Sequence, residues 1–471
     1  MDIEKIIDPA NWKLYRDKFA TDEMREIWCE ENVLQKRLDC EAAVALAQAE
    51  LGLIPSNAAK EIARKANLNY VTPGACAKHY SQTGHDIISM LRVIEEVCEN
   101  GSGEWVHFGL TTQDILDSST GLLLRDTLKI FFHDLLELED IFIKLADEHK
   151  LTVMAGRPHG QYGVPMTFGL KVATWLAELG RGIDRLIECS NRLLVGNFTG
   201  AVGTYAPQLG KGRDVERRAL ELLKLRRAEV CTHPARDRIA EFLANLAFIG
   251  NTFSRIGNEV YQLQKPEILE LATKFREGEQ IDSSTMPQKR NPVGVDHWKG
   301  IAKLLRGNAL VAMEVAVEHE RDPSRLAAEQ SALPRSCANL AAVLAEAKTI
   351  LGTLQVYSKN MRKNLERDRG FIMSEALIYA IAKKTGKKQW AHHLVYEVAQ
   401  EAISARKDLK TAVLEREDIS GILSRIEIDK VLDPGDWIGE SEAKVEEVIA
   451  LRIDRRKELQ EELKKLELCP Q

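Results

Sequence analysis

The sequence lacks long apolar runs and any excess of positive charge. No window approaches the roughly 18 consecutive apolar residues of a membrane span, so we predict no transmembrane helix. The formal net charge is −6, whereas a nucleic-acid-binding surface would need a basic face. The first residues, MDIEKIIDPANWK, are acidic and lack the apolar core of a signal peptide. These absences argue against a membrane protein, a nucleic-acid-binding protein and a secreted protein.

Cysteine-pair motifs are absent as well. The eight cysteines form no CxxC pair, and the eleven histidines do not pair with them at the spacing of zinc ligands. We therefore predict reduced, mostly buried thiols in a cytoplasmic protein, with no metal site and no cofactor. The cysteines are Cys29, Cys40, Cys76, Cys98, Cys189, Cys231, Cys337 and Cys469.

Alternating strand patterns of useful length are missing too, whereas helical periodicity runs through most of the chain. From Gln113 to Lys150, apolar residues such as Leu124, Leu128 and Phe131 recur at three- and four-residue steps without a proline. As one helix this stretch would span about 57 Å at ~1.5 Å per residue, so we predict an all-α bundle. Further helical stretches are Val164–Leu194, Asp214–Leu223, Arg236–Leu271, Gly294–Glu320 and Pro334–Leu365.

Prolines and glycines suggest three helical domains. Residues 1–108 contain short helices, residues 109–365 carry the long central helices, and residues 366–471 return to shorter helices. Elements as long as the central ones find too few partners within one chain to bury all their apolar faces. We therefore expect the central helices to pack against other copies of the chain.

One loop between two helical stretches reads IDSSTMPQKRNP, at positions 281–292. Its two prolines cannot donate backbone hydrogen bonds and disfavour helix in the preceding residues. The loop carries hydroxyls, a fixed cation and an amide, among them Ser283, Ser284, Lys289 and Asn291. Such donors suit a small anion, or removal of a proton from a carbon beside one.

Two further polar stretches stand where long helices begin. SQTGHDI carries Thr83 and His85, and a lone histidine near a helix start is usually structural. HFGLTTQDILDSS carries Thr111 and Thr112, whose plain reading is a well-capped helix. The functional reading is that the same hydroxyls and free N–H groups bind a carboxylate.

Two other stretches carry candidate proton-transfer and charge groups. In GRPHGQYGVPMTFG, two prolines and four glycines break the helical pattern around His159, and an irregular turn favours an acid or base histidine. The second stretch is EHERDPSRLAAEQ, at 318–330, which contains Arg321. By itself it indicates a helix end stabilised by salt bridges.

Together these stretches resemble the fumarase/aspartase superfamily, in its adenylosuccinate lyase and 3-carboxymuconate cycloisomerase branch. SSTMPQKRNP resembles the family's most specific loop, except that Asp282 replaces a glycine. LTTQDILDSS and GRPHGQYGVPMTFG resemble the two other signature blocks, in the right order, and TGAVGTY, PARDRIAEF and LDPGDWIG extend the similarity over nearly the whole chain.

The resemblance implies a tetramer with a twenty-helix core, whose active sites each combine three chains. It implies anti β-elimination from a substituted succinate with release of fumarate, most simply by C–N cleavage. In that reading Ser283 is the base and His159 the acid. Substrate would be bound by Thr83, His85, Thr111, Thr112, Lys289 and Asn291, with Asp296, Ser284 and Arg321 in support.

Several positions depart from the adenylosuccinate lyase pattern. Gln330 stands where an arginine grips the nucleotide phosphate, and Lys18 and Phe19 replace an Arg-Tyr pair used for the same group. Ala235 replaces a glutamine, and Asp296 replaces a glutamate that orients the acid histidine. Because arginine pairs carry much of the affinity for a phosphate, we expect phosphorylated substrates to be poor.

Three alternatives remain beside C–N elimination. The first is cleavage of a C–S or C–O succinyl adduct by the same chemistry. The second is a carboxymuconate cycloisomerase, which handles protons similarly but releases no fragment. The third is a structural homologue without activity, against which the intact Ser283, His159, Lys289 and Asn291 argue.

Overall fold

The computed structural model describes residues 9–315, 319–321 and 323–469. The described part contains nineteen α-helices, and its six strands are only two or three residues long. The predicted all-α fold is confirmed. None of the helices described has both the length and the apolar character needed to cross a membrane.

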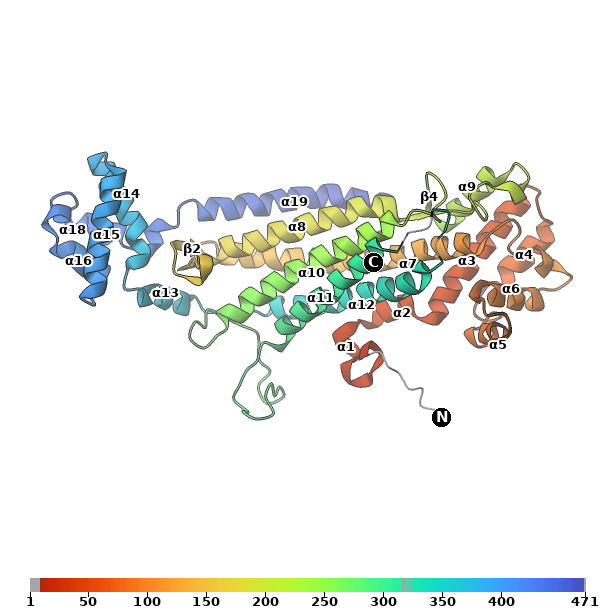
Figure 1. The fold of residues 1–471 in the computed structure, drawn as a ribbon, viewed down its shortest axis with the longest axis horizontal. Coiled ribbons are helices and arrows are strands. Elements are labelled where there is room, and N and C mark those ends of the chain that lie inside the picture. Colours follow the sequence, from red (N-terminus) through yellow and green to blue (C-terminus); the bar gives the residue numbers. More distant parts are fainter. Residues whose placement is uncertain (1–8, 316–318, 322, 470–471) are drawn as a thin grey trace.

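Long helices form an elongated bundle (Figure 1), and the helix expected from Gln113 to Lys150 is its longest member. That helix buries its apolar stripe completely, because Leu128, Phe131 and Leu135 have no exposed surface. The bundle helices are α7 (Thr112–Glu148), α8 (Phe168–Leu193), α10 (Asp237–Leu263), α11 (Val293–Met313), α12 (Arg325–Gly352) and α19 (Ser441–Lys465).

Shorter helices gather at the two ends of the bundle (Figure 1). Those at one end are α3 (Glu30–Glu50), α4 (Ser56–Lys65), α5 (Pro73–Thr83), α6 (Asp86–Val97) and α9 (Gly212–Leu223), whereas α1 (Arg16–Phe19) and α2 (Asp22–Trp28) lie along the bundle against α12. Those at the other end are α13 (Ser358–Arg367), α14 (Ser374–Thr385), α15 (Lys388–Ser404), α16 (Leu409–Glu415), α17 (Glu417–Ser420) and α18 (Arg425–Val431).

Three short strand pairs join distant segments. Strand β1 (Val153–Ala155) pairs with β2 (Pro165–Thr167) in antiparallel register, Val153 opposite Thr167. The parallel pair is β3 (Val195–Gly196) with β4 (Arg226–Arg227), and the second antiparallel pair is β5 (Leu271–Ala272) with β6 (Gln355–Val356). Single 3-10 turns lie at Pro9–Asn11, Lys13–Tyr15, Ser102–Trp105, Pro158–Gly160, Ala206–Gln208, Phe371–Met373 and Pro434–Trp437.

These strand pairs explain why two helices are shorter than predicted. The stretch predicted from Val164 becomes helical only at Phe168, because residues 165–167 pair as β2. The stretch predicted to run to Leu271 ends at Leu263, because Leu271 pairs in β5. Local periodicity cannot reveal a strand partner that lies far away in the sequence.

Two helix predictions around residue 320 were wrong in their bounds. The helix predicted to reach Glu320 ends at Met313, and residues 316–318 of that prediction lie outside the described residues. The helix predicted from Pro334 to Leu365 instead begins at Arg325 and stops at Gly352. Pro334 lies inside α12, where buried neighbours such as Leu333 and Cys337 hold the helix despite the lost hydrogen bond.

Separate apolar cores occupy the middle and the two ends of the molecule. The largest lies among α7, α8, α10, α11 and α12. A second packs α3, α6 and α9 around the start of α7, and a third packs α14, α15 and α16. The domain boundaries at 108/109 and 365/366 stay a prediction.

Candidate active site

Four predicted substrate-binding residues converge where α5, α6 and α7 meet. Thr83 ends α5, His85 caps α6, and Thr111 caps α7. The Nδ1 atom of His85 accepts a hydrogen bond from the backbone N–H of Ile88 at 3.3 Å, which leaves the ring proton on Nε2. That nitrogen lies 3.4 Å from the Oγ1 atom of Thr112. All four residues are partly exposed, so an anion can reach them.

The first turn of α7 has the features of an anion-binding site. Thr111 stands at the N-cap, where its backbone N–H donates to the Asp114 carboxylate at 3.0 Å. The start of a helix carries partial positive charge and unpaired N–H groups. The hydroxyls of Thr111 and Thr112 add donors at the same point, so this end of α7 suits a carboxylate ligand.

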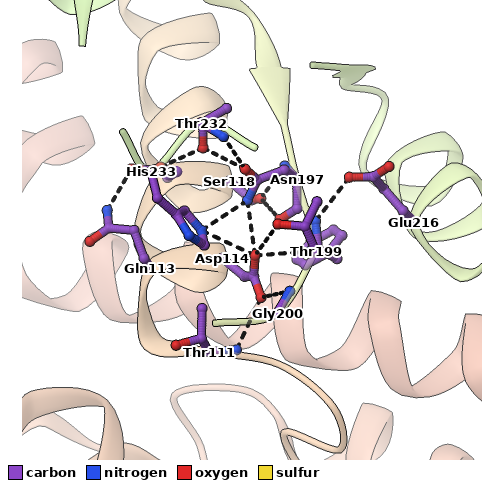
Figure 2. Close-up of polar contacts among 12 residues, drawn as sticks. Thr111, Gln113, Asp114, Ser118, Asn197, Thr199, Gly200, Glu216, Thr232 and His233 are labelled. Atoms are coloured by element: carbon purple, nitrogen blue, oxygen red, sulfur yellow. Dashed lines mark hydrogen bonds and ion pairs between the residues drawn. The ribbon is translucent and has the colours of Figure 1, made fainter. Parts of the chain in front are cut away.

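A buried polar cluster supports this helix end (Figure 2). The Asp114 carboxylate is fully buried and accepts hydrogen bonds from the side-chain amide of Asn197 and the backbone N–H groups of Thr199 and Gly200, each at 3.0 Å. His233, which is 1% exposed, places Nε2 3.2 Å from an oxygen of Asp114. The cluster therefore ties α7 to two loops far away in the sequence.

The pKa of His233 reflects this surrounding. Burial by itself would lower it, but the hydrogen bond and charge of Asp114 outweigh burial, together with the Cys231 thiol, and raise the pKa to about 9. His233 is therefore an imidazolium at neutral pH, which compensates the buried carboxylate.

Ser283 lies in the loop between β5 and α11, which projects from the bundle (Figure 1). Its Oγ atom accepts hydrogen bonds from the backbone N–H groups of Thr285 at 3.3 Å and Met286 at 3.0 Å. Two N–H groups aimed at one hydroxyl oxygen would stabilise negative charge on it. Ser283 is half-buried, whereas Ser284 is exposed.

Asp282, which precedes Ser283, closes the same loop. The Asp282 carboxylate accepts from the backbone N–H of Asn291 at 3.1 Å, and the Asn291 amide donates to the Asp282 carbonyl at 2.7 Å. Lys289 is exposed beside this closure. The bonds of Asn291 therefore stabilise this conformation of the loop, and Lys289 is exposed to solvent.

His159 occupies a tight turn between β1 and β2. Its backbone is left-handed, with φ of 53°, and its side chain is exposed. The turn is anchored by Arg157, whose Nη1 atom donates to the fully buried Glu270 carboxylate at 2.9 Å. Glu270 immediately precedes β5, so the His159 turn is anchored at the base of the Ser283 loop.

One chain does not bring all the predicted residues together. Thr112 begins α7, and β1, which leads to His159, follows the end of that helix. The 37 residues of α7 span about 56 Å at ~1.5 Å per residue. Figure 1 shows α5 and α6 at one end of the bundle and β2 toward the other. Thr83, His85, Thr111 and Thr112, called the threonine group below, are thus separated from His159 by the length of the bundle.

Two predicted supporting residues lie on α11 and in the link that follows it. Asp296 lies in the first turn of α11 and pairs with Lys299, with an Oδ1–Nζ distance of 2.7 Å. Arg321 is exposed in the link between α11 and α12. Within the described residues no contact joins Asp296 to His159, so the orienting role expected for Asp296 stays a prediction.

A cavity of about 540 Å³ opens beside the threonine group. Its wall includes Asp86 and Gln113, the sequence neighbours of His85 and Thr112. Its arginines are already paired: Arg37 lies 3.2 Å from Asp86, and Arg236 lies 2.9 Å from Asp117 and 2.6 Å from Glu329. Further lining residues are Trp28, Leu34, Tyr80, Met90, Leu116, Leu123, Leu326, Gln330 and Leu333.

Possible metal ligands meet elsewhere. In the described ranges, one group brings three donor atoms within reach of a single ion: His133, Asp134 and Glu137 on α7. Lys348 already holds that place, with Nζ 2.5 Å from Asp134 and 2.8 Å from Glu137. The group is therefore a salt-bridge network on the side of the bundle.

Sequence reasoning missed the supporting cluster and the cavity. Asp114 was noticeable as the third helical residue after a threonine cap, the position of a capping box. His233 and Asn197 carried no local signal, because their partners lie more than a hundred residues and about eighty residues away, respectively. Only the fold brings them to α7.

Family models and related proteins match most of the chain. The family described as lyase matches residues 16–307, and the family described as adenylosuccinate lyase C-terminus matches residues 370–448. An adenylosuccinate lyase of Methanocaldococcus jannaschii is 38% identical over 92% of this chain and 94% of the relative. An N-acetyl-S-(2-succino)cysteine lyase of Dickeya dadantii is 39% identical over 93% of this chain and 96% of the relative.

A solved structure has the same fold. The 3-carboxy-cis,cis-muconate lactonizing enzyme of Pseudomonas putida superimposes with a TM-score of 0.86 at 31% identity. The match covers 94% of this chain and 99% of the other. Proteins that are similar to this chain to this extent are named for different substrates. The substrate therefore has to be argued from the residues of the site.

Proposed function

The chain belongs to the lyase family of the fumarase/aspartase superfamily, and from that premise we propose that it removes a substituent from a substituted succinate by anti β-elimination and releases fumarate. The leading reaction is C–N cleavage, as in the adenylosuccinate lyases it resembles. The observation that carries the proposal is the pair of backbone N–H groups aimed at the Ser283 hydroxyl. They stabilise the alkoxide that a serine base requires.

The predicted catalytic and substrate-binding residues each have a place in this reaction. Ser283 takes the proton from the carbon beside one carboxylate, and His159 protonates the departing atom on the opposite face. Lys289 and Asn291 hold the carboxylate on which charge develops, after Asn291 leaves its bond to Asp282. Thr111 and Thr112 hold the other carboxylate at the start of α7, with Thr83 and His85 beside them.

The separation of these groups along the bundle supports a site made by several chains. We propose a homotetramer with a twenty-helix core, in which the α7 end of one chain meets the His159 turn and the Ser283 loop of others. Exposed apolar side chains on α11, among them Leu304, Leu310 and Met313, offer a face for such packing. All eight cysteines are free, which supports a cytoplasmic location.

The cavity beside the threonine group favours a leaving group without phosphate. A phosphate dianion entering it would meet two arginines already held by carboxylates, and the further carboxylate of Glu30. Gln330 lines the same cavity and brings no charge. This charge distribution favours a second candidate alongside C–N cleavage: C–S elimination from a succinylated thiol, the type of substrate in the name of the Dickeya dadantii relative.

The experiment compares fumarate release from three substrates: adenylosuccinate, its unphosphorylated nucleoside, and an S-succinyl thiol. We expect the unphosphorylated substrates to react faster than adenylosuccinate. Gln330→Arg should improve adenylosuccinate selectively, because it adds an unpaired cation to the cavity. Gln330→Met, of similar size and without charge, is the matched control and should leave the preference unchanged.

Each outcome has a separate meaning. Adenylosuccinate turnover with kcat/KM of about 10⁴ M⁻¹s⁻¹ or more would contradict the leaving-group argument and leave the elimination intact. Lactone formation from a carboxymuconate without fumarate would replace the lyase by a cycloisomerase. No turnover of any of these substrates would favour the structural homologue.

A further inference from the structure

The place of the His159 ring is set by the turn that carries it. Arg157 stands immediately before the 3-10 turn Pro158–Gly160, and its carbonyl accepts a hydrogen bond from the backbone N–H of Gly160 at 3.2 Å. The backbone of His159 inside this turn is left-handed, at φ 53°. Within the described residues, no hydrogen bond or ion pair holds the ring of His159 itself. Whatever fixes the turn therefore fixes the ring.

The guanidinium of Arg157 holds this turn from two sides. Its Nη1 and Nη2 atoms donate to the two oxygens of the Glu270 carboxylate, at 2.9 and 2.5 Å. Its Cζ atom also lies 5.6 Å from the centre of the Tyr162 ring, which follows His159 in the chain. A planar guanidinium held by two parallel hydrogen bonds is fixed in orientation, whereas a single ammonium contact is not. One group thus holds the chain before and after His159.

Glu270 is a rigid anchor for this guanidinium. It has no exposed surface, and its Oε1 atom also accepts a hydrogen bond from the side-chain amide of Asn364 at 2.8 Å. Its backbone N–H donates to the carbonyl of Leu263 at 2.8 Å, and its carbonyl accepts from the N–H of Tyr357 at 2.9 Å. These contacts attach Glu270 to the end of α10 and to α13. The position of the carboxylate is therefore fixed by the bundle.

We propose that Arg157 and Glu270 are positioning residues for the acid of the reaction, because their paired contact sets the place of the His159 ring. The inference rests on the proposed function, in which His159 gives a proton to the departing atom. Proton transfer requires the donor to lie within hydrogen-bond reach of that atom. A misplacement of about 1 Å can cost about 10²-fold in rate. Loosening the pair should therefore slow the step that uses the proton.

The test replaces the double contact of Arg157 by a single ammonium. Arg157→Lys keeps a positive charge beside buried Glu270 but cannot make two parallel hydrogen bonds. The substrates are the three named above, adenylosuccinate, its unphosphorylated nucleoside and an S-succinyl thiol, and the fastest of them is used throughout. We expect kcat to fall about 10²-fold. KM should stay nearly unchanged, because other residues are proposed to bind the substrate carboxylates.

A double variant separates positioning from general damage. Arg157 is proposed to act only through His159, so its substitution should cost nothing further once His159 is alanine. The kcat of Arg157→Lys/His159→Ala should therefore equal that of His159→Ala. A double variant slower than His159→Ala by the full factor of Arg157→Lys would overturn the inference. A wild-type kcat in Arg157→Lys would overturn it as well.

Arg456→Lys is the matched control, because Arg456 also pairs with a fully buried carboxylate, that of Glu139. The Arg456 side chain is 22% exposed and that of Arg157 is 18% exposed. Arg456 lies on α19, which carries none of the groups proposed for catalysis. Arg456→Lys should therefore keep the wild-type kcat. A loss equal to that of Arg157→Lys would indicate general damage and overturn the inference.

The leaving group gives a second readout. S-succinyl nitrothiophenol releases a weakly basic thiolate that departs without a proton, so with this substrate the loss in Arg157→Lys should shrink to less than about tenfold. An undiminished loss would overturn the inference. Glu270→Asp keeps the carboxylate but shortens its reach, and it should show the same pattern if Arg157→Lys fails to fold.

Failure of the proposed function is distinguishable from failure of the pair. A wild-type kcat in His159→Ala, or no fumarate from any of these substrates with the wild-type protein, would contradict the proposed function, and the inference would fall with it. A slow His159→Ala variant together with an unaffected Arg157→Lys variant would overturn the positioning role alone.

Discussion

At the scale of single side chains, the candidate base is distinguished by its hydrogen bonds. The Oγ atom of Ser283 faces two backbone N–H groups, and the hydroxyl of the neighbouring Ser284 is exposed. Neither serine packs into an apolar core. Substitution at either position should therefore report on chemistry with little effect on folding.

Ser283→Ala should lower kcat by about 10²–10⁴-fold, the usual contribution of a positioned acid or base group. KM should change little, because Lys289 and the threonines still bind the carboxylates. The measurement is the rate of fumarate formation with a turned-over succinyl substrate. Ser284→Ala is the matched control and should keep most of the activity. Loss in Ser284→Ala with full activity in Ser283→Ala would shift the base by one residue.

The pair of His107 and Glu41 should make the stability of the fold depend on pH. His107, four residues before Thr111, places Nδ1 2.6 Å from the carboxylate of Glu41, which is 1% exposed. Burial of His107 opposes its charge, but Glu41 outweighs burial and raises the His107 pKa. The folded state therefore holds this proton more tightly than the unfolded chain, whose histidine pKa is about 6.5.

The stabilisation from this pair should be complete below about pH 6.5 and should fade as the pH rises through the raised pKa of His107. The measurement is the urea midpoint of unfolding between acidic and alkaline pH. His107→Asn tolerates the left-handed backbone at φ 61° but cannot titrate, so its profile should be flatter than that of the wild type. Identical slopes in the two proteins would exclude His107 as the source.

At the scale of elements, α19 is joined to the bundle by buried charge. Glu139 of α7 has no exposed surface and accepts hydrogen bonds from Arg452 at 2.7 Å and from Arg456 at 2.7 Å. Arg452 also reaches Asp184 of α8 at 3.0 Å. Gly180 lies against the Arg452 guanidinium, and an added Cβ there would come within 2.5 Å of it. Arginines of α19 thus dock this C-terminal helix against α7 and α8.

Glu139→Ala should destabilise the protein by about 3–5 kcal/mol, because it leaves two arginines near a buried site without their carboxylate. The measurement is the free energy of unfolding in urea, with hydrogen exchange of α19 as a local readout. Asp140→Ala is the matched control: Asp140 is 62% exposed and pairs only at the surface, so its loss should cost about 0–1 kcal/mol. Equal losses would contradict a buried anchor.

At the scale of the whole molecule, the bundle leaves apolar side chains exposed and the proposed catalytic groups far apart. Leu304, Leu310 and Met313 of α11 are between 48% and 62% exposed, and Phe248 of α10 is 54% exposed. The groups proposed for catalysis are spread along the bundle (Figure 1). Both features favour the proposed assembly, in which the long helices of several chains pack together.

Light scattering should return the mass of four chains, each of 52.9 kDa. Leu310→Glu should reduce assembly and activity together, because it places a charge on the α11 face. Leu451→Glu on α19 is the matched control, since Leu451 is 61% exposed against 62% for Leu310, and it should keep both properties. A stable monomer with full activity would contradict both the assembly and the shared site.

The sequence by itself determined the fold class and the family, whereas the residues of the site stay a prediction. The helical period is a local property, so the stripe of Leu124, Leu128 and Phe131 predicted a buried helix face without knowledge of its partners. Caps and prolines are local too, which is why TTQD marked the start of α7 and the two prolines marked the Ser283 loop. The signature blocks pointed to the family because they are contiguous in the chain.

Only the tertiary structure decided which of these groups meet. The contact of His85 with Thr112 and the pairing of His233 with Asp114 depend on helix packing over 27 and 119 positions, which no local pattern records. The strands at 165–167 and at Leu271 exist because distant backbone groups pair with them. The length of α7 separates Thr112 from His159, so the fold also decided that these two predicted site residues lie far apart within one chain.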